Sequence, residues 1–123
     1  MSKYSALITP TFESQYNKLK KKYPKIDEDF DSFLDEIEID GNLGEDIQGV
    51  TKDGNKVFKK RMKNTSAKKG LSGGFRIIEY LVTSENIVYL LDIYSKSEKE
   101  DIPKKRIAKL IKNDIVLKKY IKK

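Results

Sequence analysis

The sequence predicts a single α+β domain, residues 1–123, in which two N-terminal helices and one C-terminal helix accompany four short strands. Three observations favour this class. Apolar residues recur with a helical period near the N-terminus, they alternate with polar residues at period two in the middle of the chain, and the helical period returns toward the end. A chain of this length can bury roughly two-thirds of the surface that its unfolded form exposes, so we expect it to fold alone.

The first elements are predicted to be a strand followed by a helical hairpin. Residues 4–8 (YSALI) form the strand candidate, and Thr9-Pro10 is typical of a helix N-cap with proline at the first helical position. Two apolar stripes at helical spacing then flank Pro24, which ends the first helix. Their members are Phe12, Tyr16, Leu19 and Tyr23, and then Ile26, Phe30, Phe33, Leu34 and Ile37. The second helix is acidic at its start, which suits the positive end of its dipole.

The middle of the chain predicts three strands, at 56–63, 74–82 and 87–94. The glycine-rich segment 41–55 turns the chain back toward them, and its Asp-Gly pair is typical of a hairpin or loop end. The last of the three strands, IVYLLDIY, has the β-branched and aromatic content of a central strand. We expect its Asp92, and Glu79 in the strand before it, to be partnered or at an edge, because a buried lone carboxylate is costly.

The C-terminal helix is predicted from Ile107, Leu110 and Ile111, whose apolar side Ile115, Leu117 and Ile121 continue. Residues 97–100 (SEKE) match a capping box, and Pro103 indicates a second helix start just after the first turn.

Charge is distributed unevenly along the chain, whose net charge is +7. Residues 26–53 carry one lysine and eleven acids, a net charge of −10, whereas residues 54–76 carry eight basic side chains and no acid. This alternation is compatible with one basic and one acidic face, and a basic face is typical of a nucleic-acid binder. We expect the acidic block to lie away from such a site.

The basic segment 56–76 contains two of the three arginines. At period two, Lys59 and Arg61 share one face of a strand, and Arg76 shares a face with Tyr80 in the next strand. Lysines on strands most often face water. A guanidinium, by contrast, can hold a phosphate through two hydrogen bonds, which favours a functional interpretation of the arginines.

The residue types that are missing exclude several chemistries. The chain has no cysteine and no histidine, which removes disulfides, thiolate metal sites and the commonest acid/base side chain. No cofactor and no metal are expected. The absence of a long apolar run and of a cleavage pattern near the N-terminus favours a soluble, cytoplasmic protein without a membrane partner.

Several stretches together resemble the RelE/ParE superfamily, specifically the HigB-like toxins of type II toxin–antitoxin pairs. They are GEDIQG, KKRMK, KKGLSGGFRIIEYL and IVYLLDIYSKSEKEDI, followed by a closing helix, and they span nearly the whole chain. The resemblance implies a RelE-like fold with a mainly antiparallel four-stranded sheet, on which the helical hairpin and the C-terminal helix pack. It also implies a ribosome-dependent endoribonuclease, an mRNA interferase that cleaves messenger RNA until an antitoxin neutralises it.

Arg61 and Arg76 are the residues we assign to the scissile phosphate. The resemblance places the strand end with Tyr94 and Lys96 beside the arginines, so these two are the proton-transfer candidates, with their individual roles open. Tyr94 could instead be a core aromatic and Lys96 a solvated lysine. Lys68 and Lys69 are predicted to bind RNA backbone, and Lys59 could do so or take part in chemistry. Tyr80 could stack on a base or pack in the core.

The implied partners are the ribosome with its messenger RNA and a cognate antitoxin. The antitoxin is expected to be HigA-like and DNA-binding, so DNA would be contacted only through the complex. Two other functions remain open at this point: a ParE-like toxin that inhibits gyrase, and a non-catalytic basic module that binds RNA or DNA. Fold alone does not separate them.

Overall fold

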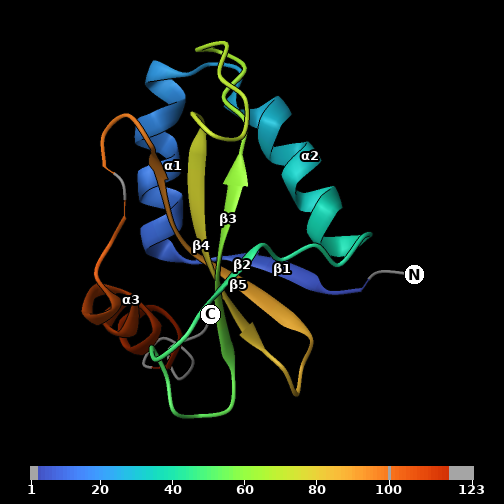
Figure 1. Cartoon of the computed structure of the whole chain (residues 1–123), viewed down its shortest axis with the longest axis vertical. Coiled ribbons are helices and arrows are strands. Elements are labelled where there is room, and N and C mark those ends of the chain that lie inside the picture. Colours follow the sequence, from blue (N-terminus) through green and yellow to red (C-terminus); the bar gives the residue numbers. More distant parts are fainter. Residues whose placement is uncertain (1–2, 100, 117–123) are drawn as a thin grey trace.

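The computed structural model describes residues 3–99 and 101–116. Within them the elements follow in the order β1 (Ser5–Ile8), α1 (Pro10–Lys22), α2 (Ile26–Glu38), β2 (Glu45–Ile47), β3 (Lys56–Met62), β4 (Phe75–Val82), β5 (Ile87–Ser95) and α3 (Lys104–Ile111), with a π-helical turn at Lys112–Val116. Figure 1 shows a twisted sheet in the middle, with α1 and α2 beside its upper part and α3 near its lower left. The fold is α+β, as the sequence predicts.

The sheet of the described chain has five strands in the order β1-β5-β4-β3-β2. Strands β2, β3, β4 and β5 are antiparallel to their neighbours, whereas β1 runs parallel to β5. The prediction of four strands was therefore wrong by one, because β2 lies in the segment 41–55 that we expected only to turn the chain. Strand β2 has only three residues, and Ile47 is its single apolar side chain, so it is too short to show an alternating apolar and polar pattern.

Two apolar cores cover the two faces of the sheet. On one face, Phe12 of α1 and Phe33 of α2 pack with Ile77 of β4. On the other, Ile107 of α3 packs with Ile78 of the same strand. Successive strand residues point to opposite faces, so β4 is buried on both sides and its apolar residues contribute to both cores. Below, the two sides are called the hairpin face and the α3 face.

The start of α1 agrees with the prediction from the sequence, whereas the start of α3 agrees only in part. Thr9 caps α1, since its side chain accepts a hydrogen bond from the Phe12 amide. At the C-terminus, α3 begins at Lys104 directly after Pro103, and Ser97 lies in a turn rather than at a helix start. The predicted start at Pro103 is thus confirmed and the capping box is wrong: the Ser97 amide bonds to the Ser95 hydroxyl instead. Leu117 and Ile121 lie outside the described residues.

Candidate functional site

A row of polar side chains crosses three neighbouring strands on the α3 face. In the antiparallel registers, Arg61 of β3 lies opposite Arg76 of β4, and Arg76 lies opposite Tyr94 of β5. Residues directly opposite each other in antiparallel strands have their Cβ atoms roughly 5 Å apart, and like charges in that position destabilise a sheet. The arginine pair therefore creates a positive potential that a bound anion would relieve.

Arg76 is held rigidly in this row. Its side chain is only 4% exposed, and it donates hydrogen bonds to the carbonyl oxygens of Leu71 at 2.9 Å, Ser72 at 2.8 Å and Phe75 at 3.1 Å. Burial, and then the neighbouring Arg61 charge, lowers the pKa of Arg76. Three hydrogen bonds leave part of the five-donor guanidinium for another acceptor. Arg76 thus fixes the loop that leads into β4 and keeps its charge at the site.

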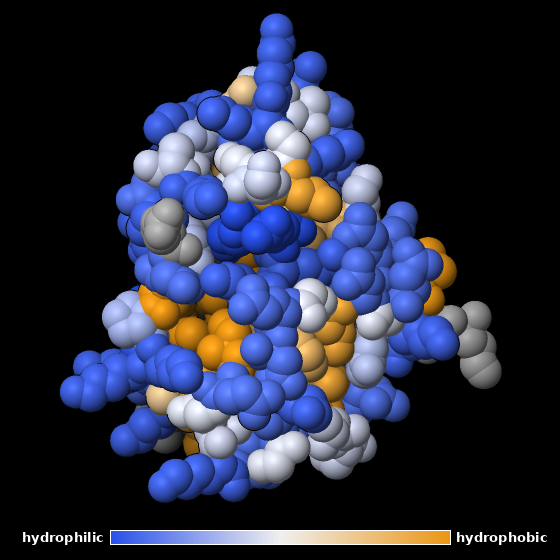
Figure 2. Space-filling view, in the orientation of Figure 1, coloured by the Kyte–Doolittle hydropathy of each residue, from blue (hydrophilic) through white to orange (hydrophobic). Residues whose placement is uncertain are grey.

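Arg61 is exposed, and within the described residues it forms no ion pair. It lines two open cavities along the outer edge of β3, of about 370 and 390 Å³, and Leu71 lines both as well. Figure 2 shows hydrophobic surface at several places on the face turned toward the viewer, separated by hydrophilic residues. Arg61 is therefore free to move toward a ligand, in contrast to Arg76.

The acidic helix α2 lies closer to Arg61 than we expected. Asp29 and Glu36 line the same cavity as Arg61, so the expectation that the acidic block lies away from the site is wrong on this side. Both carboxylates already have partners. Asp29 accepts hydrogen bonds from the Thr65 amide and hydroxyl, and Glu36 pairs with the Lys60 ammonium. Their local negative charge is thereby partly compensated.

Tyr94 is a buried member of the row, 2% exposed. Burial, and then the Asp101 carboxylate, raises its pKa to about 12. The Lys99 ammonium lies 5.6 Å from the centre of its ring, a favourable cation–π distance. The phenol is accordingly protonated at neutral pH, where it can donate a hydrogen bond but does not accept a proton.

Asp101 is a residue of this face that sequence reasoning did not select. Both of its carboxylate oxygens lie 3.4 Å from Nζ of Lys59, which is on the same face of β3 as Arg61. Lys59 and Asp101 line a cavity of about 270 Å³ between β2 and α3. The sequence shows only that Asp101 follows β5 by a few residues, since no periodic pattern connects it to a strand 42 positions earlier.

The three other predicted lysines gather at the loop end of the sheet. Lys68 and Lys69 lie in the loop between β3 and β4, where the backbone groups of Asn64 and Lys69 bond to each other at 2.9 Å. The Lys96 amide donates to the Gly74 carbonyl at 3.0 Å, which brings the end of β5 to the same loop. All three side chains are exposed. The structure thus brings the lysines to the end of the sheet where Arg61 and Arg76 lie.

Tyr80 lies elsewhere on the α3 face and serves the fold. It is 3% exposed, and its hydroxyl donates to Asp53 at 2.6 Å and accepts from the Asn55 side chain at 3.0 Å. Burial, and then the bond to Asp53, raises its pKa to about 12. So little of the ring is exposed that a base has no face to stack on, and we do not include Tyr80 in the proposal below.

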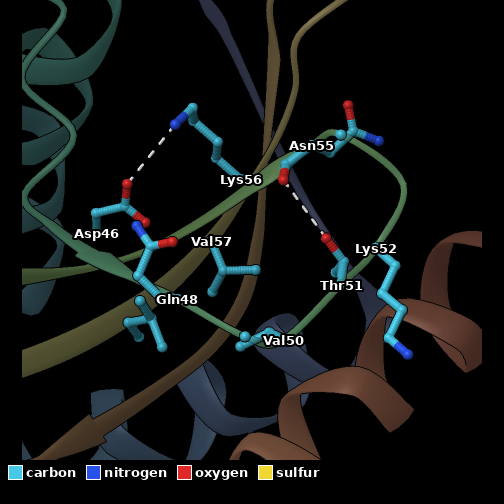
Figure 3. Close-up of a pocket in the computed structure, with 11 residues that line it drawn as sticks. Asp46, Gln48, Val50, Thr51, Lys52, Asn55, Lys56 and Val57 are labelled. Atoms are coloured by element: carbon cyan, nitrogen blue, oxygen red, sulfur yellow. Dashed lines mark hydrogen bonds and ion pairs between the residues drawn. The ribbon is translucent and has the colours of Figure 1, made fainter.

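A cavity of about 250 Å³ is lined by the β2–β3 loop and the first residues of β3 (Figure 3), whereas Arg61 lies near the other end of that strand. Figure 3 shows an ion pair of Lys56 with Asp46, 3.7 Å apart, and a hydrogen bond from the Thr51 hydroxyl to the Asn55 carbonyl. Lys52, by contrast, points away from these groups. These contacts stabilise the loop conformation.

Asp92 and Glu79, the two carboxylates within strands, differ in their hydrogen bonding. Asp92 accepts a hydrogen bond from the Ile93 amide at 2.9 Å, and its burial raises its pKa. Glu79 is fully buried in the central strand β4, and neither carboxylate oxygen has a hydrogen-bond partner in the described chain. The expectation of a partner is therefore wrong for Glu79. Burial raises its pKa well above the ordinary value, and the Lys60 charge opposes this only in part.

No protein-family model matches this chain. None of the helices in residues 3–99 and 101–116 is long and apolar enough to cross a membrane. In the same part of the chain, no group of three or more acidic side chains is arranged to hold a metal ion. The site is thus defined by its own side chains, the arginine row and the Lys59–Asp101 pair.

Proposed function

We propose that this protein is a ribosome-dependent endoribonuclease, the HigB-like toxin of a type II toxin–antitoxin pair within the RelE/ParE superfamily. The observation that carries the proposal is the position of the exposed Arg61 directly opposite the buried Arg76 on neighbouring strands. Two guanidinium groups in that register repel each other unless an anion lies between them or above them. A phosphodiester fits this requirement, because arginine matches phosphate oxygens in both charge and geometry.

The proposed reaction is an attack of the RNA 2′-hydroxyl on the adjacent phosphorus. The new bond gives a 2′,3′-cyclic phosphate, and the bond to the 5′-oxygen of the next nucleotide breaks. Negative charge on the phosphoryl oxygens increases in the transition state, where Arg61 and Arg76 stabilise it. Removing one such preorganised donor commonly slows a reaction about a hundred- to a thousandfold.

The exposed lysines of the loop end extend the positive surface beyond the reacting phosphate. Lys68 and Lys69 would contact backbone phosphates of the messenger or the ribosomal RNA. We propose the same role for Lys96, in place of the proton transfer expected from the sequence, because its exposed side chain follows the end of β5 at this loop. Such contacts position the protein without reading sequence. The cavities on either side of Arg61 give room for the nucleotides that flank the cleaved bond.

The test is to induce the protein in bacteria and to map the 5′ ends of cellular messenger RNA. We expect new ends within translated regions, and we expect them to disappear in an Arg61→Ala/Arg76→Ala variant and when translation is blocked. Because Arg76 also stabilises a loop, the single variant Arg61→Ala separates lost chemistry from lost folding. A matched control is Arg106→Ala, which removes an exposed arginine from α3.

Growth arrest without new 5′ ends would contradict the nuclease and favour the gyrase-inhibiting alternative, which should induce a DNA-damage response. RNA binding without either effect would favour the non-catalytic module. Relief of growth arrest by co-expression of the gene adjacent to the toxin gene would identify the antitoxin, which we propose to be a HigA-like, DNA-binding protein.

A further inference from the structure

The arginine row can bind a phosphate, but it lacks a group that accepts a proton. A guanidinium carries only donors, and the buried Tyr94 phenol keeps its proton at neutral pH. The chain has no histidine. An ionised carboxylate accepts a proton without first losing one of its own. In-line attack by a 2′-hydroxyl requires such an acceptor, and a donor for the leaving oxygen.

Asp101 supplies a carboxylate at the right place. It contacts Lys59, which lies two residues before Arg61 on the same strand and therefore on the same face. Two residues along a strand span roughly 7 Å, so the long side chains at these two positions can reach the same phosphodiester. The Asp101 side chain is 65% exposed and so is accessible to substrate. Asp92, also on this face, is buried and already bonded to a backbone amide.

The two members of the pair come from different elements. Lys59 extends from β3, and Asp101 from the segment between β5 and α3. Their separation of 3.4 Å is long for a charge-assisted hydrogen bond, which prefers about 2.8 Å. The Tyr94 phenol also interacts with the Asp101 carboxylate, so this carboxylate can turn from Lys59 toward a substrate while it keeps a hydrogen-bond donor beside it. Lys59 also lines one of the two cavities that Arg61 lines, so a phosphodiester held there would meet the Lys59 ammonium, with the Asp101 carboxylate next to it.

We propose that Asp101 is the general base and Lys59 the general acid of the cleavage. Asp101 takes the proton of the 2′-hydroxyl as the bond from that oxygen to phosphorus forms. Lys59 gives a proton to the 5′-oxygen as its bond to phosphorus breaks. The products are the cyclic phosphate, a free 5′-hydroxyl, a carboxylic acid and a neutral amine. Transfer of the proton from Asp101 to Lys59 within the pair then restores the starting charges.

This inference rests on the proposed nuclease function and assigns the proton transfers within the same site. Its test uses purified full-length protein and ribosomes that carry a messenger RNA with a mapped cleavage site. One messenger has the ordinary phosphodiester at that bond, and a second has sulfur in place of the bridging 5′-oxygen. A thiolate leaves without being protonated, so the second messenger needs a base but no acid. Rates are measured in single turnover.

We expect Lys59→Met to slow cleavage of the ordinary messenger about a hundred- to ten-thousandfold. The sulfur messenger should restore its rate to near that of the wild type. Lys59→Arg keeps the charge that faces Asp101 but gives up a proton poorly, so it should show the same pattern without losing stability. Asp101→Asn should be slow on both messengers, and Asp101→Glu should recover part of the rate.

Asp27→Asn is the matched control, because Asp27 forms an exposed ion pair with Lys20 at 2.7 Å on the helical hairpin. It should cleave both messengers like the wild type. The assignment would be wrong, with the nuclease intact, if Asp101→Asn cleaved the ordinary messenger at the wild-type rate or if the sulfur messenger restored the rate of Asp101→Asn. It would also be wrong if the sulfur messenger failed to restore the rates of both Lys59 variants. Failure of the wild type to cleave the ordinary messenger would overturn both.

Discussion

At the scale of single residues, Arg61 and Arg76 have the same charge and opposite roles in the fold. Arg76 donates three hydrogen bonds to loop carbonyls from a buried position, whereas Arg61 is exposed. The bond to the Phe75 carbonyl is buried and the other two are partly buried, and a hydrogen bond to a charged group contributes about 1.5–3 kcal/mol. Arg76→Ala should therefore lower the free energy of unfolding in urea by at least about 2 kcal/mol. Arg61→Ala should change it by less than about 0.5 kcal/mol.

The outcome decides what a loss of activity means. If both variants destabilise the protein equally, the loop contacts of Arg76 contribute little, and its burial has another cause. If the difference is as expected, Arg61→Ala is the cleaner probe of phosphate binding. Arg76→Lys should resemble Arg76→Ala in stability, since an ammonium cannot donate to three carbonyls in the same planar arrangement.

Glu79 gives a second prediction at the residue scale. Its pKa is raised by burial, so the folded protein binds the proton more tightly than the unfolded chain does. Its contribution to stability is fully present below the ordinary pKa of 4.5 and is lost as the pH rises toward the folded pKa. In that interval the wild type should lose up to about 1.4 kcal/mol per pH unit relative to Glu79→Gln.

The measurement is urea unfolding of wild type and Glu79→Gln between pH 4 and pH 8. A pH-independent offset is expected, because glutamine also buries a polar group, so the slope of the difference is the informative quantity. The control is Glu98→Gln, an exposed position, for which the difference should stay flat. A flat difference for Glu79→Gln as well would mean that its carboxyl is ionised in the folded protein.

At the scale of elements, the β3–β4 loop depends on one glycine. A Cβ atom built on Gly74 would lie 2.2 Å from the Met62 carbonyl oxygen and 2.9 Å from that of Gly70. Both atoms are backbone and cannot rotate away. Gly74→Ala should therefore cost about 1–3 kcal/mol of unfolding free energy and should displace the loop that Arg76 contacts.

Gly70 in the same loop is the matched control. A Cβ there meets nothing within 4 Å, so Gly70→Ala should be neutral or stabilise by up to about 1 kcal/mol through the unfolded chain. Thermal unfolding of the two alanine variants would compare them directly. Equal melting temperatures would contradict the close approach of β3 and β4 at this loop.

The elements also show what sequence could predict. Strands β1, β3, β4 and β5 and the helices α1 and α2 have patterns long enough to be recognised. Strand β2 does not, and its pairing with β3 is decided by tertiary context. The arginines were predicted near strand ends. Their exact register follows from the hairpin of β3 and β4, because the predicted limits of the two strands give the length of its loop. The Lys59–Asp101 contact was not predictable, because it depends on where the chain returns after β5.

At the scale of the whole molecule, exposed lysines lie at the loop end of the sheet next to the arginine row, while acidic α2 borders the row on one side and Asp101 lies on the α3 face. If RNA follows the loop end of the sheet, its binding should weaken steeply with salt. Each phosphate contact that is lost should reduce the slope of log affinity against log salt by about 0.7 for a single strand. Lys68→Gln/Lys69→Gln should therefore reduce it by about 1.4 if both lysines contact phosphate.

The matched comparison is Asp31→Asn/Asp35→Asn on the exposed side of α2, which changes the net charge by the same amount in the opposite direction. Binding of a fluorescent single-stranded RNA, measured from 50 to 300 mM salt, gives both slopes. If local contacts dominate, only the lysine variant changes the slope. If net charge alone attracts the RNA, the two variants should shift affinity symmetrically, and the loop would then have no specific place in binding. The distinction matters for the cleavage site, because only local contacts can hold a particular phosphodiester against Arg61.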